Sequence, residues 1–88
     1  MTYAVLLTPK AANSLRKLKR TVGPRMIEVL ESLESHPEVG ERLAPSQFWK
    51  VRVGDFRVIY EIHKSQDKVI VLFIGHRKNV YDEFSRLA

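Results

Sequence analysis

Apolar residues recur with a helical period in the first half of the sequence and with a strand period in the second half. The opening run, residues 3–7, is apolar at successive positions and is typical of a short strand. Thr8 and Pro9 follow it and predict the start of a helix, with Thr8 as the N-cap and Pro9 at the first helical position. This helix has an apolar side and a cationic side, formed respectively by Ala11, Ala12, Leu15 and Leu18 and by Arg16, Lys17, Lys19 and Arg20.

A second amphipathic helix is predicted after the Gly23-Pro24 pair, which ends the first. Its apolar stripe follows the spacing i, i+4, i+7 and consists of Met26, Leu30 and Leu33. The His36-Pro37 pair ends this helix, because a residue that precedes proline is disfavoured in the α region. A short link between two helices predicts an antiparallel pair, and residues 38–46 are expected to form a loop.

The second half of the sequence predicts three strands, at residues 48–53, 56–62 and 69–74. Gly54-Asp55 suits a two-residue hairpin turn between the first two strands, and residues 64–67 form a polar turn before the third. The third strand is apolar on both faces, so we expect it to lie inside the sheet. Residues 78–88 are expected to form an optional short helix.

These elements predict the order β-α-α-β-β-β in a single domain, residues 1–88. The fold class is α+β, with two N-terminal helices packed on a mainly antiparallel sheet. A chain of this length buries a modest fraction of its surface, so its apolar side chains should all belong to one core.

The hairpin has a register that can be derived from its turn. A two-residue turn at Gly54-Asp55 pairs Arg52 with Arg57, and the neighbouring pairs follow by alternation. One face then carries the apolar side chains that must pack on the helices, which are Trp49, Val51, Val53, Phe56, Val58 and Tyr60. The other face carries Lys50, Arg52 and Arg57, together with Phe48, Ile59 and Glu61.

The cationic side of this hairpin is expected to bind phosphate. Two arginines directly opposite each other are unfavourable for folding, so their pairing indicates an anionic ligand. The alternative is an ordinary solvated sheet face that Glu61 partly neutralises. Gly75 lets the chain turn after the last strand, and a plain four-residue turn at 64–67 would place Ile74 opposite Arg57. Strict alternation then places His76 on the cationic face and Arg77 on the other.

Composition favours an anionic partner. Fifteen Lys and Arg against ten Asp and Glu give a formal net charge of +5, which is typical of proteins that bind nucleic acid or an acidic protein. There is no cysteine, and the three histidines are too scattered to suggest a zinc site, so no metal site is expected. The first residues lack a charged leader and a long apolar stretch, so we expect a cytoplasmic protein without a membrane segment.

Two segments resemble the toxins of the RelE/ParE superfamily. Residues 50–61, Lys-Val-Arg-Val-Gly-Asp-Phe-Arg-Val-Ile-Tyr-Glu, are similar to the central hairpin of RelE-type toxins. Residues 74–81, Ile-Gly-His-Arg-Lys-Asn-Val-Tyr, resemble their closing motif. Length and element order also agree, so the resemblance covers nearly the whole chain and implies a toxin of a type II toxin–antitoxin system.

The resemblance implies cleavage of messenger RNA in the ribosomal A site, without a metal or any other cofactor. The RNA's own 2′-hydroxyl attacks the neighbouring phosphate and leaves a 2′,3′-cyclic phosphate. The basic hairpin residues of the family match Lys50, Arg52 and Arg57, and the closing residues match Arg77 and Tyr81, with Lys78 as a further RNA-binding cation. Arg57 would hold phosphate oxygens through its planar fork, Arg77 would lie by the leaving oxygen, and Tyr81 would orient the attacking nucleotide.

One departure from the family concerns Arg52, because the best-known ribonuclease members have lysine there. Arginine stays protonated and cannot be the general base, so the base is Lys50, Tyr81 or His76. A gyrase-directed toxin of the ParE type shares the fold and is an alternative. A non-catalytic basic module that binds nucleic acid is another.

The resemblance also implies partners, which are an acidic antitoxin, the ribosome with its messenger RNA, and operator DNA only through the antitoxin. The antitoxin could dock in a groove beside the helices, where apolar residues of the stripe from Met26 to Leu33 would be exposed. It could instead pair its carboxylates with Arg52 and Arg57, or displace residues 78–88 and move Tyr81.

Overall fold

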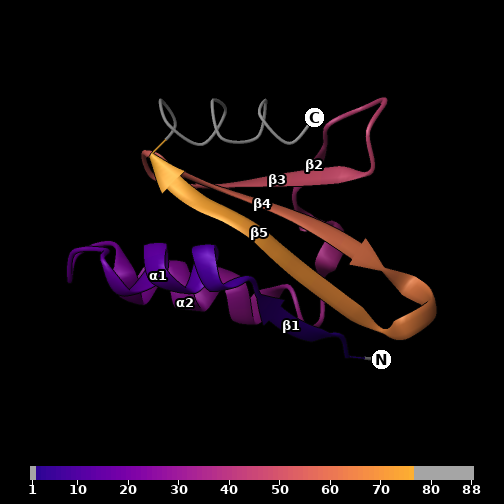
Figure 1. Ribbon diagram of the computed structural model, residues 1–88, viewed down its shortest axis with the longest axis horizontal. Coiled ribbons are helices and arrows are strands. Elements are labelled where there is room, and N and C mark those ends of the chain that lie inside the picture. The colour runs from indigo at the N-terminus through magenta and orange to yellow at the C-terminus, as the bar shows by residue number, and fades with distance from the viewer. Residues whose placement is uncertain (1, 77–88) are drawn as a thin grey trace.

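The computed structural model describes residues 2–76, and the expected C-terminal helix at 78–88 lies outside the described residues, as do Arg77, Lys78 and Tyr81. Within residues 2–76, two helices lie on one side of a twisted five-stranded sheet (Figure 1). This arrangement confirms the expected α+β fold and the order β-α-α-β-β-β, to which the structure adds one two-residue strand before the hairpin. None of the helices in this part of the chain is long and apolar enough to cross a membrane.

The N-terminal elements are β1 (Ala4–Leu7), α1 (Pro9–Arg16) and α2 (Gly23–Ser32). The predicted cap is confirmed, because the Thr8 Oγ1 accepts a hydrogen bond from the Ala11 amide at 3.2 Å. The same hydroxyl donates to the Leu72 carbonyl at 3.1 Å and so ties the start of α1 to the sheet. Helix α1 ends at Arg16, earlier than the Gly23-Pro24 pair, and the chain then reverses into α2 (Figure 1).

The remaining strands are β2 (Glu41–Arg42), β3 (Phe48–Val53), β4 (Phe56–His63) and β5 (Lys68–His76), with single 3-10 turns at Pro37–Val39 and Lys64–Gln66. The strand order is β1-β5-β4-β3-β2, in which β1 runs parallel to β5 and the other neighbours are antiparallel. The apolar strand β5 lies between β1 and β4, as expected for a strand inside the sheet. Strand β2 lies within residues 38–46, so the expectation that this whole segment is a loop was wrong.

The predicted hairpin register between β3 and β4 is confirmed at every position. Arg52 pairs with Arg57, and the pairs on either side are Val53–Phe56, Val51–Val58, Lys50–Ile59, Trp49–Tyr60 and Phe48–Glu61. Gly54 has a φ of 61° at the turn, a backbone conformation that glycine adopts without a steric penalty.

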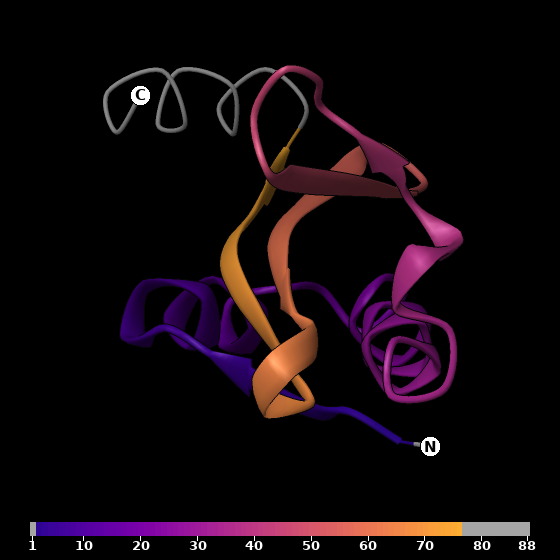
Figure 2. The same cartoon turned by 90° about the vertical axis from the view of Figure 1, so that its right-hand side faces the viewer.

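The main core lies between the helices and the sheet (Figure 2). As predicted from the hairpin register, the core joins four residues of the hairpin to four leucines that lie in the helices or just after them. These are Trp49, Val51, Val58 and Tyr60 with Leu15, Leu18, Leu30 and Leu33. Met26 and Leu33 are fully buried in this core and Leu30 nearly so, which leaves Ile27 as the exposed large apolar residue of α2. A partner that docked beside the helices would therefore meet Ile27 of this stripe, and not Met26, Leu30 or Leu33.

A bulge interrupts the pairing of β4 with β5. Ile59 pairs with Phe73 and Tyr60 pairs with Val71, so Leu72 is an extra residue on β5. A small second cluster lies at this point on the other face of the sheet, with Ile59 and Phe73 buried and Leu43, Phe48 and Leu72 packed on them. The bulge shifts every later residue of β5 by one position relative to β4.

Tyr60 joins the core to the loop that leads into β2. Its ring is fully buried, and its hydroxyl donates to the Pro37 carbonyl at 2.7 Å and accepts from the Gly40 amide at 3.2 Å. Burial raises the pKa of Tyr60, because the ionised phenolate would lose its hydration. At Gly40 a Cβ atom would lie 2.4 Å from the Lys50 carbonyl oxygen and 2.6 Å from the Tyr60 hydroxyl, so the loop can approach the sheet only through glycine.

We expect Tyr60→Phe to lower the free energy of unfolding by about 1–3 kcal/mol, because the Pro37 carbonyl and the Gly40 amide lose a buried partner. Urea unfolding at neutral pH measures this loss, and Tyr3→Phe, at a tyrosine outside this hydrogen-bond pair, is the control. Because folding raises the pKa of Tyr60, the stability that its neutral form contributes is present below about pH 10 and is lost as the pH rises through the folded pKa. The wild-type chain should therefore lose more stability above pH 10 than Tyr60→Phe does. Equal losses would contradict the role of this hydroxyl.

Candidate functional site

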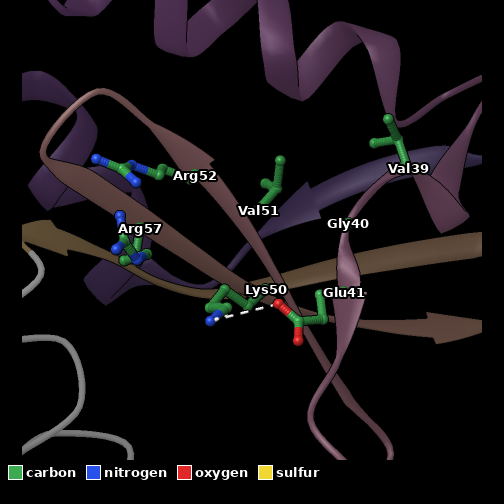
Figure 3. A pocket seen from close by; sticks show the side chains of 7 residues that line it. All are labelled: Val39, Gly40, Glu41, Lys50, Val51, Arg52 and Arg57. Atoms are coloured by element: carbon green, nitrogen blue, oxygen red, sulfur yellow. Dashed lines mark ion pairs between the residues drawn. The ribbon is translucent and has the colours of Figure 1, made fainter.

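Three cations come together on the face of the sheet that the helices leave open. Lys50 and Arg52 extend from β3, and Arg57 extends from β4 (Figure 3). With Val39, Gly40, Glu41 and Val51 they line a hollow of about 380 Å³. This hollow is the candidate site, and we call its three cations the cationic triad.

Arg52 and Arg57 are directly paired across the hairpin, so their charges repel. The Arg52 Nε donates to the Gly54 carbonyl at 3.0 Å, and an Arg57 Nη donates to the Phe56 carbonyl at 3.5 Å. The Arg57 Nε is buried and has no hydrogen-bond partner among residues 2–76. Two guanidinium groups side by side at the hollow are suited to the oxygens of a phosphate.

Lys50 faces a carboxylate from β2. Glu41 is its direct partner across the strands, and the Glu41 Oε2 lies 3.6 Å from the Lys50 Nζ. The lysine side chain is 25% exposed and the glutamate side chain 76%, so the carboxylate lies at the rim of the hollow. Glu41 was not expected from the sequence, because a two-residue strand has no hydrophobic period that could signal it.

Glu61 lies farther along β4 and makes its own contacts. Its Oε2 accepts a hydrogen bond from the Gln47 side chain at 2.9 Å and lies 3.8 Å from the His63 Nε2. It pairs across the strands with Phe48, two pairs beyond Lys50 and four beyond Arg52. The alternative in which Glu61 neutralises the triad therefore has no support from these contacts.

The bulge at Leu72 changes which residues of β5 accompany the triad. Gly75, and not Ile74, lies opposite Arg57, so the predicted pairing was wrong by one residue. His76 lies opposite Phe56 and packs edge-on against its ring, with centroids 5.7 Å apart. Because paired residues share a face, His76 lies on the helix side of the sheet, away from Arg57. The structure thus brings together Lys50, Arg52 and Arg57 but not His76, and Arg77, Lys78 and Tyr81 are outside the described residues.

We expect Arg52→Gln to raise the free energy of unfolding by about 0.2–1 kcal/mol at low ionic strength, because it removes the repulsion from Arg57. The gain should shrink in 1 M salt, which screens exposed charges. Urea unfolding at two salt concentrations measures both effects, with the exposed Arg20→Gln as a control of equal charge change. A loss of stability that persists in high salt would instead assign Arg52 a structural role through its bond to Gly54.

Comparison with known proteins agrees with the fold and with the resemblance in sequence. A chain of the RelBE2 toxin–antitoxin complex from Mycobacterium tuberculosis is 27% identical, with a TM-score of 0.79 over 88% of this chain and 100% of that chain. A chain of the archaeal RelE–RelB complex from Pyrococcus horikoshii is 25% identical, with a TM-score of 0.74 over 91% and 100%. A mutant of the E. coli toxin RelE in the free state has the same fold at 22% identity, with a TM-score of 0.80 over all of both chains.

No curated protein is similar enough in sequence to count as a match. The model of one protein family, described as the ParE toxin of the parDE type II toxin–antitoxin system, matches residues 5–81. This match spans both helices, all of the sheet except Ala4, and the cationic triad. The chain therefore belongs to the ParE family of type II toxin–antitoxin toxins, within the RelE/ParE superfamily.

Proposed function

We propose that this toxin is a metal-independent endoribonuclease that cleaves messenger RNA in the ribosomal A site and so inhibits translation. The observation that carries the proposal is the direct pairing of Arg52 with Arg57 beside Lys50, with all three cations lining one hollow. Such an arrangement disfavours folding and favours a phosphate ligand. The toxin would act in the cytoplasm, where translation takes place.

The chemistry of RNA cleavage matches the charges of the site. When the 2′-hydroxyl attacks, negative charge builds on the oxygens of a pentavalent phosphorus and on the departing 5′-oxygen. Cations already in position stabilise this charge without the reorganisation that water would need. Arg57 and Arg52 would hold the phosphate oxygens and Lys50 would add a point charge, while Arg77 and Lys78 would contact the leaving side and Tyr81 would orient the attacking nucleotide.

The position of His76 bears on the general base. His76 lies on the helix side of the sheet against Phe56, so a ribose bound at the triad would be on the far side of the strands from it. This position argues against His76 as the base, and of the other two residues expected from the sequence, Lys50 lines the hollow while Tyr81 lies outside the described residues.

A gyrase-directed toxin is the second candidate, and the family match favours it, because the matched model describes ParE toxins. A gyrase-directed toxin has no phosphate chemistry to perform, so it has no need for an unfavourable arginine pair. A non-catalytic basic module that binds nucleic acid is less consistent with membership of a toxin family.

We expect Arg57→Ala and Arg77→Ala each to lower the cleavage rate on the order of a hundredfold or more, because each removes a cation that stabilises the transition state. Primer extension on a message translated in a reconstituted system measures the rate, and a supercoiling assay with purified gyrase tests the second candidate. The exposed Arg20→Ala, on the turn after α1, is the matched control and should cleave at the wild-type rate. Cleavage at the wild-type rate by Arg57→Ala would contradict the assignment, and gyrase inhibition without RNA cleavage would establish the second candidate.

We further propose that an acidic antitoxin neutralises the toxin by pairing its carboxylates with Arg52 and Arg57, with operator DNA bound only through the antitoxin. The net charge of +5 supports this choice, and so does the burial of Met26, Leu30 and Leu33, which removes those residues from an apolar docking groove. The two similar structures from M. tuberculosis and P. horikoshii described above are complexes of a toxin with its antitoxin, RelBE2 and RelE–RelB.

Charge steering predicts a fast association with the antitoxin at low salt and a slower one as salt screens the charges. Stopped-flow or surface binding measurements between 50 mM and 500 mM salt would test this. Arg52→Glu should slow the association more than Arg20→Glu, although both change the net charge equally. An association rate that does not depend on ionic strength would exclude steering by charge.

A further inference from the structure

We propose that Gly75 forms a binding subsite for the nucleotide that carries the leaving 5′-oxygen, on the β5 side of the cationic triad. The inference rests on the proposed ribonuclease function and adds a subsite to the same face of the sheet. Gly75 lies directly opposite Arg57, and paired residues share a face. A side chain at position 75 would therefore lie next to the Arg57 guanidinium, and glycine leaves that space open. We call this space the downstream subsite.

The backbone at Gly75 does not itself require a glycine. Gly75 belongs to strand β5, and of the glycines in residues 2–76 the one with a positive φ is Gly54. Inside a strand, glycine is unfavourable, because it contributes no side-chain packing and loses more conformational freedom on folding than other residues. Such a glycine often marks a place where a ligand approaches the backbone closely. The missing side chain is therefore the property that this position supplies.

The bulge at Leu72 brings the glycine to this position. Without the bulge, Ile74 would lie opposite Arg57, and its side chain would cover the β5 side of the guanidinium. With the bulge, Ile74 lies opposite Val58 and is buried in the core on the helix side. A bulge leaves one residue unpaired in the ladder, so it also weakens the sheet locally. Two features that are unfavourable for the sheet thus combine to clear one side of Arg57.

The two sides of Arg57 have different surroundings. The hollow lies on the side of β3 and β2, because its other lining residues come from β3 and from residues 39–41. The downstream subsite lies on the opposite side, over β5. Next to it on the open face is Phe73, and the Lys10 ammonium lies 5.3 Å from the centre of the Phe73 ring. The subsite therefore has a cation on β4 and another above β5, which suits an anionic chain.

These surroundings give the RNA a direction across the sheet. With the scissile phosphate at Arg57 and Arg52, the upstream nucleotide and its attacking 2′-hydroxyl would lie over the hollow beside Lys50. The downstream nucleotide, which departs with its 5′-oxygen, would lie over Gly75. This direction agrees with the assignment of Arg77 to the leaving oxygen, because Arg77 follows Gly75 by two residues in the sequence.

The test compares the affinity of the toxin for ribosomes programmed with two RNAs that cannot be cleaved. One RNA spans the cleavage site and has a 2′-deoxynucleotide in place of the attacking ribose. The other ends at the cleavage site with a 3′-phosphate and so lacks the downstream nucleotide. We expect Gly75→Ala and Gly75→Val to weaken binding of the spanning RNA on the order of 10–100-fold, as extra methyl groups do in a filled space. Their affinity for the truncated RNA should be that of wild type, whereas Arg57→Ala should weaken binding of both RNAs.

Urea unfolding is the second measurement, because a structural role of Gly75 predicts the opposite sign. If the position serves the substrate, Gly75→Val should keep or raise the free energy of unfolding, since valine suits a strand better than glycine. If the fold requires the glycine, or if another part of the chain fills the space, both variants should be less stable and should bind both RNAs poorly. That result would overturn the proposal. Gly23→Ala is the matched control, at a glycine where an added Cβ would have nothing within 4 Å.

Two further outcomes would also reject the downstream subsite. Equal weakening of both RNAs in a stable Gly75 variant would show that Gly75 shapes the phosphate site alone. Wild-type affinity of Gly75→Val for the spanning RNA would show that no nucleotide occupies the space. If wild type and Gly75→Val cleave an ordinary message at equal rates, this inference fails and the proposed function stands. If the wild-type toxin does not cleave, the proposed function fails and this inference fails with it.

Discussion

The register between β3 and β4 is the constraint on which the rest of the structure depends. Val58 and Tyr60 are fully buried against the helices, so every second residue of β4 must face the core. A slip of β4 by one residue would bury Arg57 and expose Tyr60, so this alternative register is strongly disfavoured. Because residues alternate between the two faces, the register that buries Val58 and Tyr60 also places Lys50, Arg52 and Arg57 on the opposite face. Each fully buried apolar side chain contributes about 1.5–3 kcal/mol, which exceeds the roughly 0.2–1 kcal/mol of repulsion between Arg52 and Arg57.

The bulge at Leu72 determines which residue of β5 lies next to Arg57 on the open face of the sheet. Without it, Ile74 would lie opposite Arg57 and His76 would share the face of Arg57. With it, Gly75 takes the place opposite Arg57, where it adds no side chain next to the guanidinium. The same bulged residue offers its carbonyl to the Thr8 hydroxyl that caps α1, so the start of the first helix and the phase of the last strand are linked.

Local signals allowed the hairpin, the capped helix and the triad to be predicted from sequence. Gly54-Asp55 fixes the turn, and the alternation of faces on each side of it fixes the register. The sequence therefore predicted that Lys50, Arg52 and Arg57 share a face. Glu41 and the position of His76 depend instead on long-range contacts. Strand β2 exists because Gly40 is held by Tyr60, twenty residues away, and the bulge has no turn or proline to mark it. A periodicity argument cannot detect either feature, because one strand is too short and the other changes phase within an unbroken apolar run.

Tyr60 connects the core, which the sequence predicted, to the loop before β2, which it did not. Its ring is part of the core that fixes β4, and its hydroxyl holds Pro37 and Gly40, which lead directly into Glu41. The carboxylate that faces Lys50 is therefore positioned from the buried side of the same strand that carries Arg57 on its open side. A chain of 88 residues has few residues that could position the site without also belonging to the core. Strand β4 packs the core with one face and carries Arg57 on the other, and the buried hydrogen bonds of Tyr60 fix the position of the neighbouring loop.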